Sequence, residues 1–204
     1  MKHVRRSHPF PNALASSLLA WFVLLLSLCC SSVSAKNVQG IELKDSIKLG
    51  EQQLVLNGAG KRSKYFFDLY IAALYLPEAS NNAQEIVTSD ETMMIQIHVT
   101  SDLITSENLM QGTSEGFDKA TGGQTDTIAS EIADFLDAFN APIKTGDYFD
   151  IVYQTRKGIT VLKNRKITKK LPYNLEFKQA LFGIWLSEQP AQESLKNSLL
   201  GKEK

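Results

Sequence analysis

The amino-acid sequence predicts an α+β fold in which helices collect on one face of an antiparallel sheet. Apolar residues alternate with polar ones, the period of a strand, over residues 41–76, 91–100 and 147–171. They recur at helical spacing over residues 105–139 and again over residues 173–201. Strands that follow one another through short turns pair antiparallel, and helices grouped between them cover one face of the sheet.

The first 35 residues have the order of a secretory leader. Basic residues stand within the first six positions, and an apolar run follows over residues 13–30. The small residues Val33 and Ala35 then occupy the −3 and −1 positions of a cleavage site. We therefore expect cleavage after Ala35.

This prediction divides the chain into a signal peptide, residues 1–35, and one domain, residues 36–204. It places the mature protein in the periplasm or outside the cell. The alternative is an uncleaved anchor, because about 18 apolar residues are just long enough to span a bilayer.

The leader also removes most of the side chains that carry metal or thiol chemistry. Both cysteines and two of the three histidines lie in residues 1–35, which leaves His98 alone in the domain. No disulfide, cysteine nucleophile, metal site or cofactor is therefore expected. The leader holds three of the 22 basic residues and none of the 22 acidic ones, so the domain has a formal charge of −3. This mild acidity argues against nucleic acid as a partner.

The first half of the domain is predicted to be mostly strands. Residues 41–56 form a hairpin with its turn at residues 50–52, and residues 64–76 continue as a long aromatic strand. Residues 81–90 form a short helix or turn, and residues 91–100 form another strand.

The second half begins with helices. The first helix starts at a cap near Ser101 or Thr105 and ends at the Gly122–Gly123 pair, and an amphipathic helix follows over residues 125–140. Residues 147–171 return to period two with a turn at residues 156–158, and two helices end the chain.

Ten residues are expected to contribute to the core or to line a cleft, with alternate positions of residues 65–75 facing the helices and the others less covered. They are Phe66, Leu69, Ile71, Leu74, Met94, Ile97, Phe135, Phe139, Leu181 and Trp185.

Residues 163–170 include five basic residues, which alternate in part with the apolar Ile167 and Leu171 along a predicted strand. A solvated, edge-protecting strand face is the first interpretation. Peripheral contact with an anionic membrane is the alternative.

Arg62 is the most informative residue, because the turn "GAGKR" brings a permanent charge into an apolar, aromatic stretch. A phosphate-binding loop is excluded, because its spacing needs glycine where Val55 stands.

The stretch "LNGAGKR…FFDLYIAALYLP", together with the order of elements over the domain, resembles the chalcone isomerase family, above all its bacterial exported branch. The resemblance implies an open-faced β-sandwich, with a large antiparallel sheet, helices layered on one face and a ligand cleft between them. In the family, the arginine matching Arg62 holds an anionic oxygen in that cleft. Fatty-acid-binding members carry a tyrosine at the position of Tyr70, where the enzymes have threonine. The segment that supplies the catalytic tyrosine and lysine in the enzymes, residues 100–112 here, contains neither.

We therefore expect a non-catalytic protein that binds a fatty-acid-like carboxylate through Arg62, Tyr70 and Tyr75, since a guanidinium fork matches a carboxylate. In one alternative, Arg62 pairs with Asp68 or Glu115 and only braces the sheet. In another, the protein is an isomerase or lyase that uses Arg62 to stabilise an oxyanion. A structural module of the cell envelope, without a small ligand, is a third.

Overall fold

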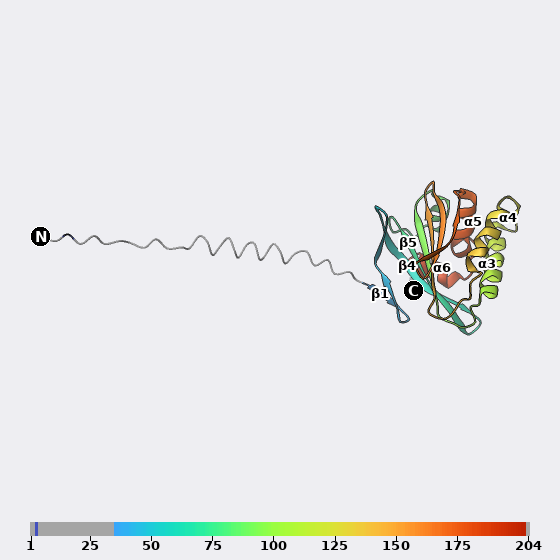
Figure 1. Ribbon diagram of the computed structural model, residues 1–204, viewed down its shortest axis with the longest axis horizontal. Coiled ribbons are helices and arrows are strands. Elements are labelled where there is room, and N and C mark those ends of the chain that lie inside the picture. Colours follow the sequence, from blue (N-terminus) through green and yellow to red (C-terminus); the bar gives the residue numbers. More distant parts are fainter. Residues whose placement is uncertain (1–2, 4–34, 203–204) are drawn as a thin grey trace. The chain divides into compact units, whose positions relative to one another are not determined.

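The computed structural model describes His3 and residues 35–202 (Figure 1). Apart from His3 and Ala35, the expected leader lies outside the described residues. The chain divides into two compact units, and the second, Ala35–Lys204, contains all the elements described below. None of the helices in the described part of the chain is long and apolar enough to cross a membrane.

Seven strands form one antiparallel sheet in which neighbours in sequence are neighbours in space. Short turns connect most of them, as the alternating patterns predicted, and the order of the strands follows the order of the chain. The strands are β3 (Ser46–Leu49), β4 (Gln52–Lys64), β5 (Phe67–Leu76), β6 (Met93–Val99), β7 (Tyr148–Gln154), β8 (Gly158–Lys163) and β9 (Lys166–Leu171).

Helices cover one face of this sheet, so the predicted α+β architecture is confirmed. Figure 1 shows α3, α4 and α5 together on one side of the sheet, with β1 on the other. The helices are α2 (Ala83–Thr88), α3 (Ser106–Thr121), α4 (Ala129–Leu136), α5 (Leu175–Leu186) and α6 (Glu193–Leu199), and the 3-10 turns η1 (Asp126–Ile128) and η2 (Asp137–Phe139) flank α4. Thr105 caps the start of α3 by accepting from the backbone N–H of Asn108, and Gly122 ends that helix in the left-handed conformation.

The opposite face of the sheet is not open along β5. Ile71, Ala73 and Tyr75, which point away from the helices, are fully buried. A hairpin of β1 (Ala35–Val38) and β2 (Ile41–Lys44) packs there and contributes Leu43 to a second hydrophobic cluster. The expectation that one parity of residues 65–75 would be less covered is therefore wrong beyond residue 70, because the hairpin hides that face.

The strand predicted over residues 64–76 begins only at Phe67, and the predicted turn at residues 58–62 is instead part of β4. β4 ends at Lys64 and β5 begins at Phe67, so Arg62 lies near the end of β4 rather than at the start of a buried strand. The turn between the two strands contains no glycine, proline or asparagine, and Tyr65 takes a left-handed φ of 57°. As a result Phe66, predicted to lie in the core, is 99% exposed.

The other predicted core residues are confirmed. Leu69 is half-buried against the main cluster. The remaining eight are buried: Ile71, Leu74, Met94, Ile97, Phe135, Phe139, Leu181 and Trp185.

Two glycines of β4 explain how α6 reaches the sheet. A Cβ on Gly58 would lie 2.2 Å from the carbonyl oxygen of Ser198, and a Cβ on Gly60 would lie 2.5 Å from the Ser198 Cβ. Only glycine therefore permits this contact between helix and strand. Gly58 and Gly60 pair across the sheet with Leu74 and Ala72.

Candidate ligand-binding site

A cavity of about 390 Å³ lies between the sheet and α3, α4 and α5. This volume falls within the range of ligand pockets, about 300–1,000 Å³. Its interior is mainly apolar, with lining residues that include Leu69, Ile97, Ile104, Leu109, Phe139 and Ile184.

Arg62 lines this cavity. Arg62 pairs across the sheet with Tyr70. It stands two positions after Gly60 in β4, so both residues face the helices, but α6 covers Gly60 and not Arg62. The half-buried side chain uses Nη1 twice, donating to the Ser63 carbonyl at 2.6 Å and to Gln192 Oε1 at 3.0 Å. Both acceptors are neutral, so neither balances its charge.

No carboxylate of the described residues forms an ion pair with Arg62. The two acids expected as alternative partners are engaged elsewhere. Asp68 accepts from Lys61 Nζ at 2.8 Å and from the Ser63 hydroxyl at 2.9 Å, and Glu115 accepts from Gln111 at 3.0 Å. A partly buried guanidinium without an acid partner is costly, and an anionic ligand would offset that cost.

Tyr70 provides a second polar group in the same cavity. Its hydroxyl is buried and accepts a hydrogen bond from the indole N–H of Trp185 at 3.1 Å. Burial raises the pKa of Tyr70. The hydrogen bond from Trp185, and the charge of Arg62 and a hydrogen bond with it, act in the opposite direction. The phenol thus keeps its proton at neutral pH, and no described residue accepts it, so Tyr70 can donate a hydrogen bond to a ligand.

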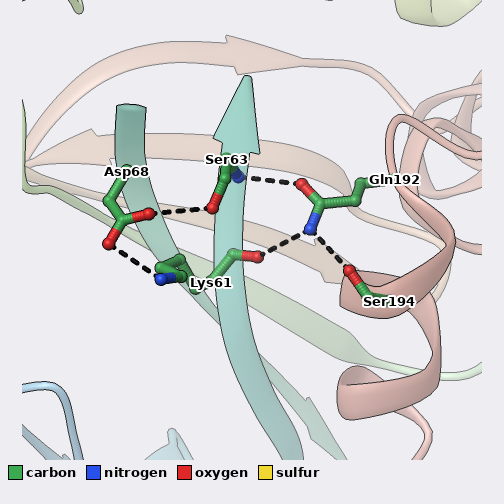
Figure 2. A network of polar contacts seen from close by, with 5 residues as sticks. All are labelled: Lys61, Ser63, Asp68, Gln192 and Ser194. Carbon is green, nitrogen blue, oxygen red and sulfur yellow. Dashed lines mark hydrogen bonds and ion pairs between the residues drawn. The ribbon is translucent and has the colours of Figure 1, made fainter. Parts of the chain in front are cut away.

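Gln192 fixes the backbone on both sides of Arg62 (Figure 2). Its Oε1 accepts from the backbone N–H of Ser63 at 2.8 Å, and its Nε2 donates to the carbonyl of Lys61 at 3.3 Å. Strand β3 pairs with β4 only as far as Val55. Beyond that point the edge of β4 has no neighbouring strand, and the Gln192 amide binds its backbone groups there instead. Gln192 also donates to the Ser194 hydroxyl at 2.6 Å, which joins Arg62 to the start of α6.

The rim of the cavity carries mixed polar groups. Lys64 from the end of β4 and Lys119 from the last turn of α3 add positive charge, and Glu115 adds one negative charge. Asn108 also lines the cavity, but its Nδ2 donates to the Leu103 carbonyl at 2.9 Å.

The structure does not bring Tyr75 to this cavity. Tyr70 and Tyr75 differ in parity along β5, so Tyr75 faces the second hydrophobic cluster on the opposite side of the sheet. Its hydroxyl is buried without a hydrogen-bond partner among the described residues. Burial, followed by the charges of Asp150 and Asp45, raises the pKa of Tyr75 to about 12. The prediction that Tyr75 shares a site with Arg62 is corrected accordingly.

Sequence reasoning also missed Gln192, which binds Arg62, and Lys64 and Lys119, which line the same cavity. Gln192 stands 130 positions from Arg62, and nothing in its local sequence indicates that its side chain would meet β4. The sequence pattern places Lys64 in the following strand, and only the turn after it puts Lys64 on the rim.

Comparison with known proteins agrees with this architecture. The sequence pattern of the chalcone isomerase-like family matches residues 35–201. Among solved structures, a fatty-acid binding protein of Arabidopsis thaliana superimposes with a TM-score of 0.63 at 14% identity, covering 82% of this chain and 95% of that one. No curated protein sequence matches. The match of the family pattern over nearly the whole compact unit shows that the chain belongs to the chalcone isomerase-like family.

Proposed function

We propose that this protein binds a fatty-acid-like carboxylate, with the head group at Arg62 and Tyr70 and the acyl chain in the apolar cavity. The observation that carries the proposal is that Arg62 faces an apolar cavity without a carboxylate partner among the described residues. A guanidinium and a phenol at one end of an apolar space match the two parts of a fatty acid.

Each group has a distinct role in this arrangement. Arg62 offers the N–H groups that Ser63 and Gln192 do not use, and these can bind a carboxylate in a two-pronged way. Tyr70 donates its O–H while Trp185 occupies one lone pair of the same oxygen. Gln192 holds the strand on either side of Arg62, so the site is largely formed before the ligand arrives.

Two further observations support a lipid-like ligand. The Arabidopsis structure that shares this fold is that of a fatty-acid binding protein. The cavity wall also continues from Arg62 into side chains of the main hydrophobic cluster, such as Ile97 and Phe139.

We also propose that the protein is exported after cleavage near Ala35. In support, the family match and the compact unit both begin at residue 35, where the leader is expected to end.

Calorimetric titration with dodecanoate tests the binding site. Arg62→Ala is expected to weaken binding more than tenfold, because breaking a buried charge pair costs about 2–5 kcal/mol. Arg62→Lys is expected to recover only part of this affinity, since an ammonium is a point charge.

Lys61→Ala is the matched control. Lys61 is the adjacent cation on β4, but its side chain pairs with Asp68 and does not line the cavity. If Arg62→Ala lowers the melting temperature by several degrees while dodecanoate binds as before, Arg62 is a brace and the proposal fails. Turnover of a 2′-hydroxychalcone that Arg62→Ala abolishes would favour the isomerase alternative.

A further inference from the structure

The tip of the β4–β5 hairpin exposes three consecutive aromatic side chains. Tyr65 is 86% exposed, Phe66 99% and Phe67 58%, and no ring contact of these three occurs among the described residues. Single exposed apolar residues are ordinary on protein surfaces, but contiguous ones mark interaction sites.

The fold itself does not explain these residues. A hairpin turn normally uses glycine, asparagine or aspartate, because one or both central residues take positive φ. Here Tyr65 takes that conformation, at φ 57°, although its side chain stays 86% exposed. The aromatic residues of the tip therefore neither favour the turn nor pack within the protein core. Their presence points to a partner outside the chain.

The tip lies at the rim of the cavity. Tyr65 and Phe67 line it, and so does Leu103, which is 47% exposed in the loop between β6 and α3. The same rim carries Lys64 and Lys119, and Glu115 is its acidic member. Lys61, farther along β4, is neutralised by Asp68.

We infer that this aromatic tip docks on an anionic lipid bilayer, with Tyr65, Phe66 and Phe67 in the interfacial layer and Lys64 toward the head groups. Aromatic side chains favour the boundary between lipid and water, and lysines beside them favour anionic lipids. Docking in this way would turn the rim of the cavity toward the acyl chains. The inference deepens the proposed function and rests on it, because the bilayer would be the source from which the fatty acid enters the cavity.

A lipid surface fits the size of the tip better than a protein partner does. Three aromatic side chains can bury about 450–750 Å². Each partner in a stable protein interface usually contributes about 800 Å². A few inserted side chains with a basic flank suffice for reversible binding to a bilayer.

Co-sedimentation with vesicles tests the inference. Residues 36–204 contain both hydrophobic clusters of the compact unit, and such a unit folds on its own, so the apolar segment 13–30 can be left out. Vesicles of phosphatidylcholine alone are compared with vesicles that also contain phosphatidylglycerol. Binding is expected to be stronger to the second, and Phe66→Ser is expected to weaken it about tenfold.

Ile167→Ser is the matched control, because Ile167 is 55% exposed on β9, a strand that also carries Lys166, Lys169 and Lys170. It is expected to leave vesicle binding unchanged. Absence of vesicle binding, or equal loss in Phe66→Ser and Ile167→Ser, would overturn the inference. So would dimerisation of the protein that Phe66→Ser abolishes while vesicle binding persists.

The two proposals fail separately. Phe66 does not line the cavity, so Phe66→Ser is expected to bind dodecanoate in solution as the unmodified domain does, while transfer of dodecanoate from vesicles slows. If dodecanoate binds neither to the unmodified domain nor to Phe66→Ser, the proposed function fails. The vesicle experiment then still shows whether the aromatic tip docks on a bilayer.

Discussion

Trp185 donates its indole N–H to the hydroxyl of Tyr70 across 3.1 Å, and both side chains are buried in the wall of the cavity. The bond joins α5 to β5 and leaves the phenol proton free to be donated to a ligand. A tyrosine held in this way is an oriented donor beside Arg62, its neighbour across the sheet.

The first prediction concerns this pair. Tyr70→Phe and Trp185→Phe should each weaken dodecanoate binding by about 0.5–1.5 kcal/mol, the value of one hydrogen bond. Their effects should be less than additive, because Trp185 acts on the ligand through Tyr70. Calorimetric titration of both single variants and the double variant measures this coupling, and fully additive losses would show that Trp185 does not orient Tyr70.

The second prediction concerns the glycines under α6. Gly60→Ala should destabilise the protein by about 1–3 kcal/mol, because the new Cβ would meet Ser198 and Leu195. Gly112→Ala is the control, since a Cβ in the middle of α3 meets nothing within 4 Å. It should raise the free energy of unfolding by up to about 1 kcal/mol. Urea denaturation measures both, and equal effects would remove the packing role assigned to Gly60.

These glycines show what the sequence could and could not reveal. The small residues before Arg62 were visible, but their purpose depends on α6, which lies about 140 positions later in the chain. The strands, the helices and the position of Arg62 in a cleft followed from periodicity and from family resemblance. Contacts between distant segments did not, as the Gln192 amide on β4 illustrates.

Two errors had definite physical causes. The turn at Tyr65–Phe66 carries no turn-forming residue, so the aromatic pattern predicts a strand from Lys64 onward where the structure has a turn. The second error places Tyr75 beside Tyr70, although the two stand five positions apart in one strand. The parity of the strand separates them, and the β1–β2 hairpin buries the face that Tyr75 occupies.

The third prediction concerns Lys178, which is fully buried and donates to the carbonyls of Ile86, Val87 and Ser89 at the end of α2. Burial lowers its pKa to about 8, against the opposing effect of Asp90 and Glu91. In the unfolded chain a lysine pKa is about 10.4, so above pH 8 the unfolded state binds more protons than the folded state. The free energy of unfolding should therefore rise from about pH 8 to about pH 10.

Urea denaturation over this range measures that rise, and Lys178→Met should remove it. The buried tyrosines do not interfere, because a raised tyrosine pKa lowers stability only above about pH 10. A rise that persists in Lys178→Met would have to come from another group.

The fourth prediction concerns export. Protein recovered from the periplasm or the medium should begin at Lys36, because Val33 and Ala35 form the expected cleavage site. N-terminal sequencing measures this directly. Recovery of protein that begins at Met1 and sediments with the membrane fraction would support the uncleaved anchor instead.

The central claim is that Arg62 holds the carboxylate of an acyl ligand, and a head-group exchange tests it most directly. Dodecanoate and dodecanol share one chain and differ at the end that Arg62 should bind. Calorimetric titration of the unmodified domain and Arg62→Ala with both compounds should show a loss of more than tenfold for dodecanoate and less than about twofold for dodecanol. Equal losses for the two compounds, or no loss for dodecanoate, would contradict the claim.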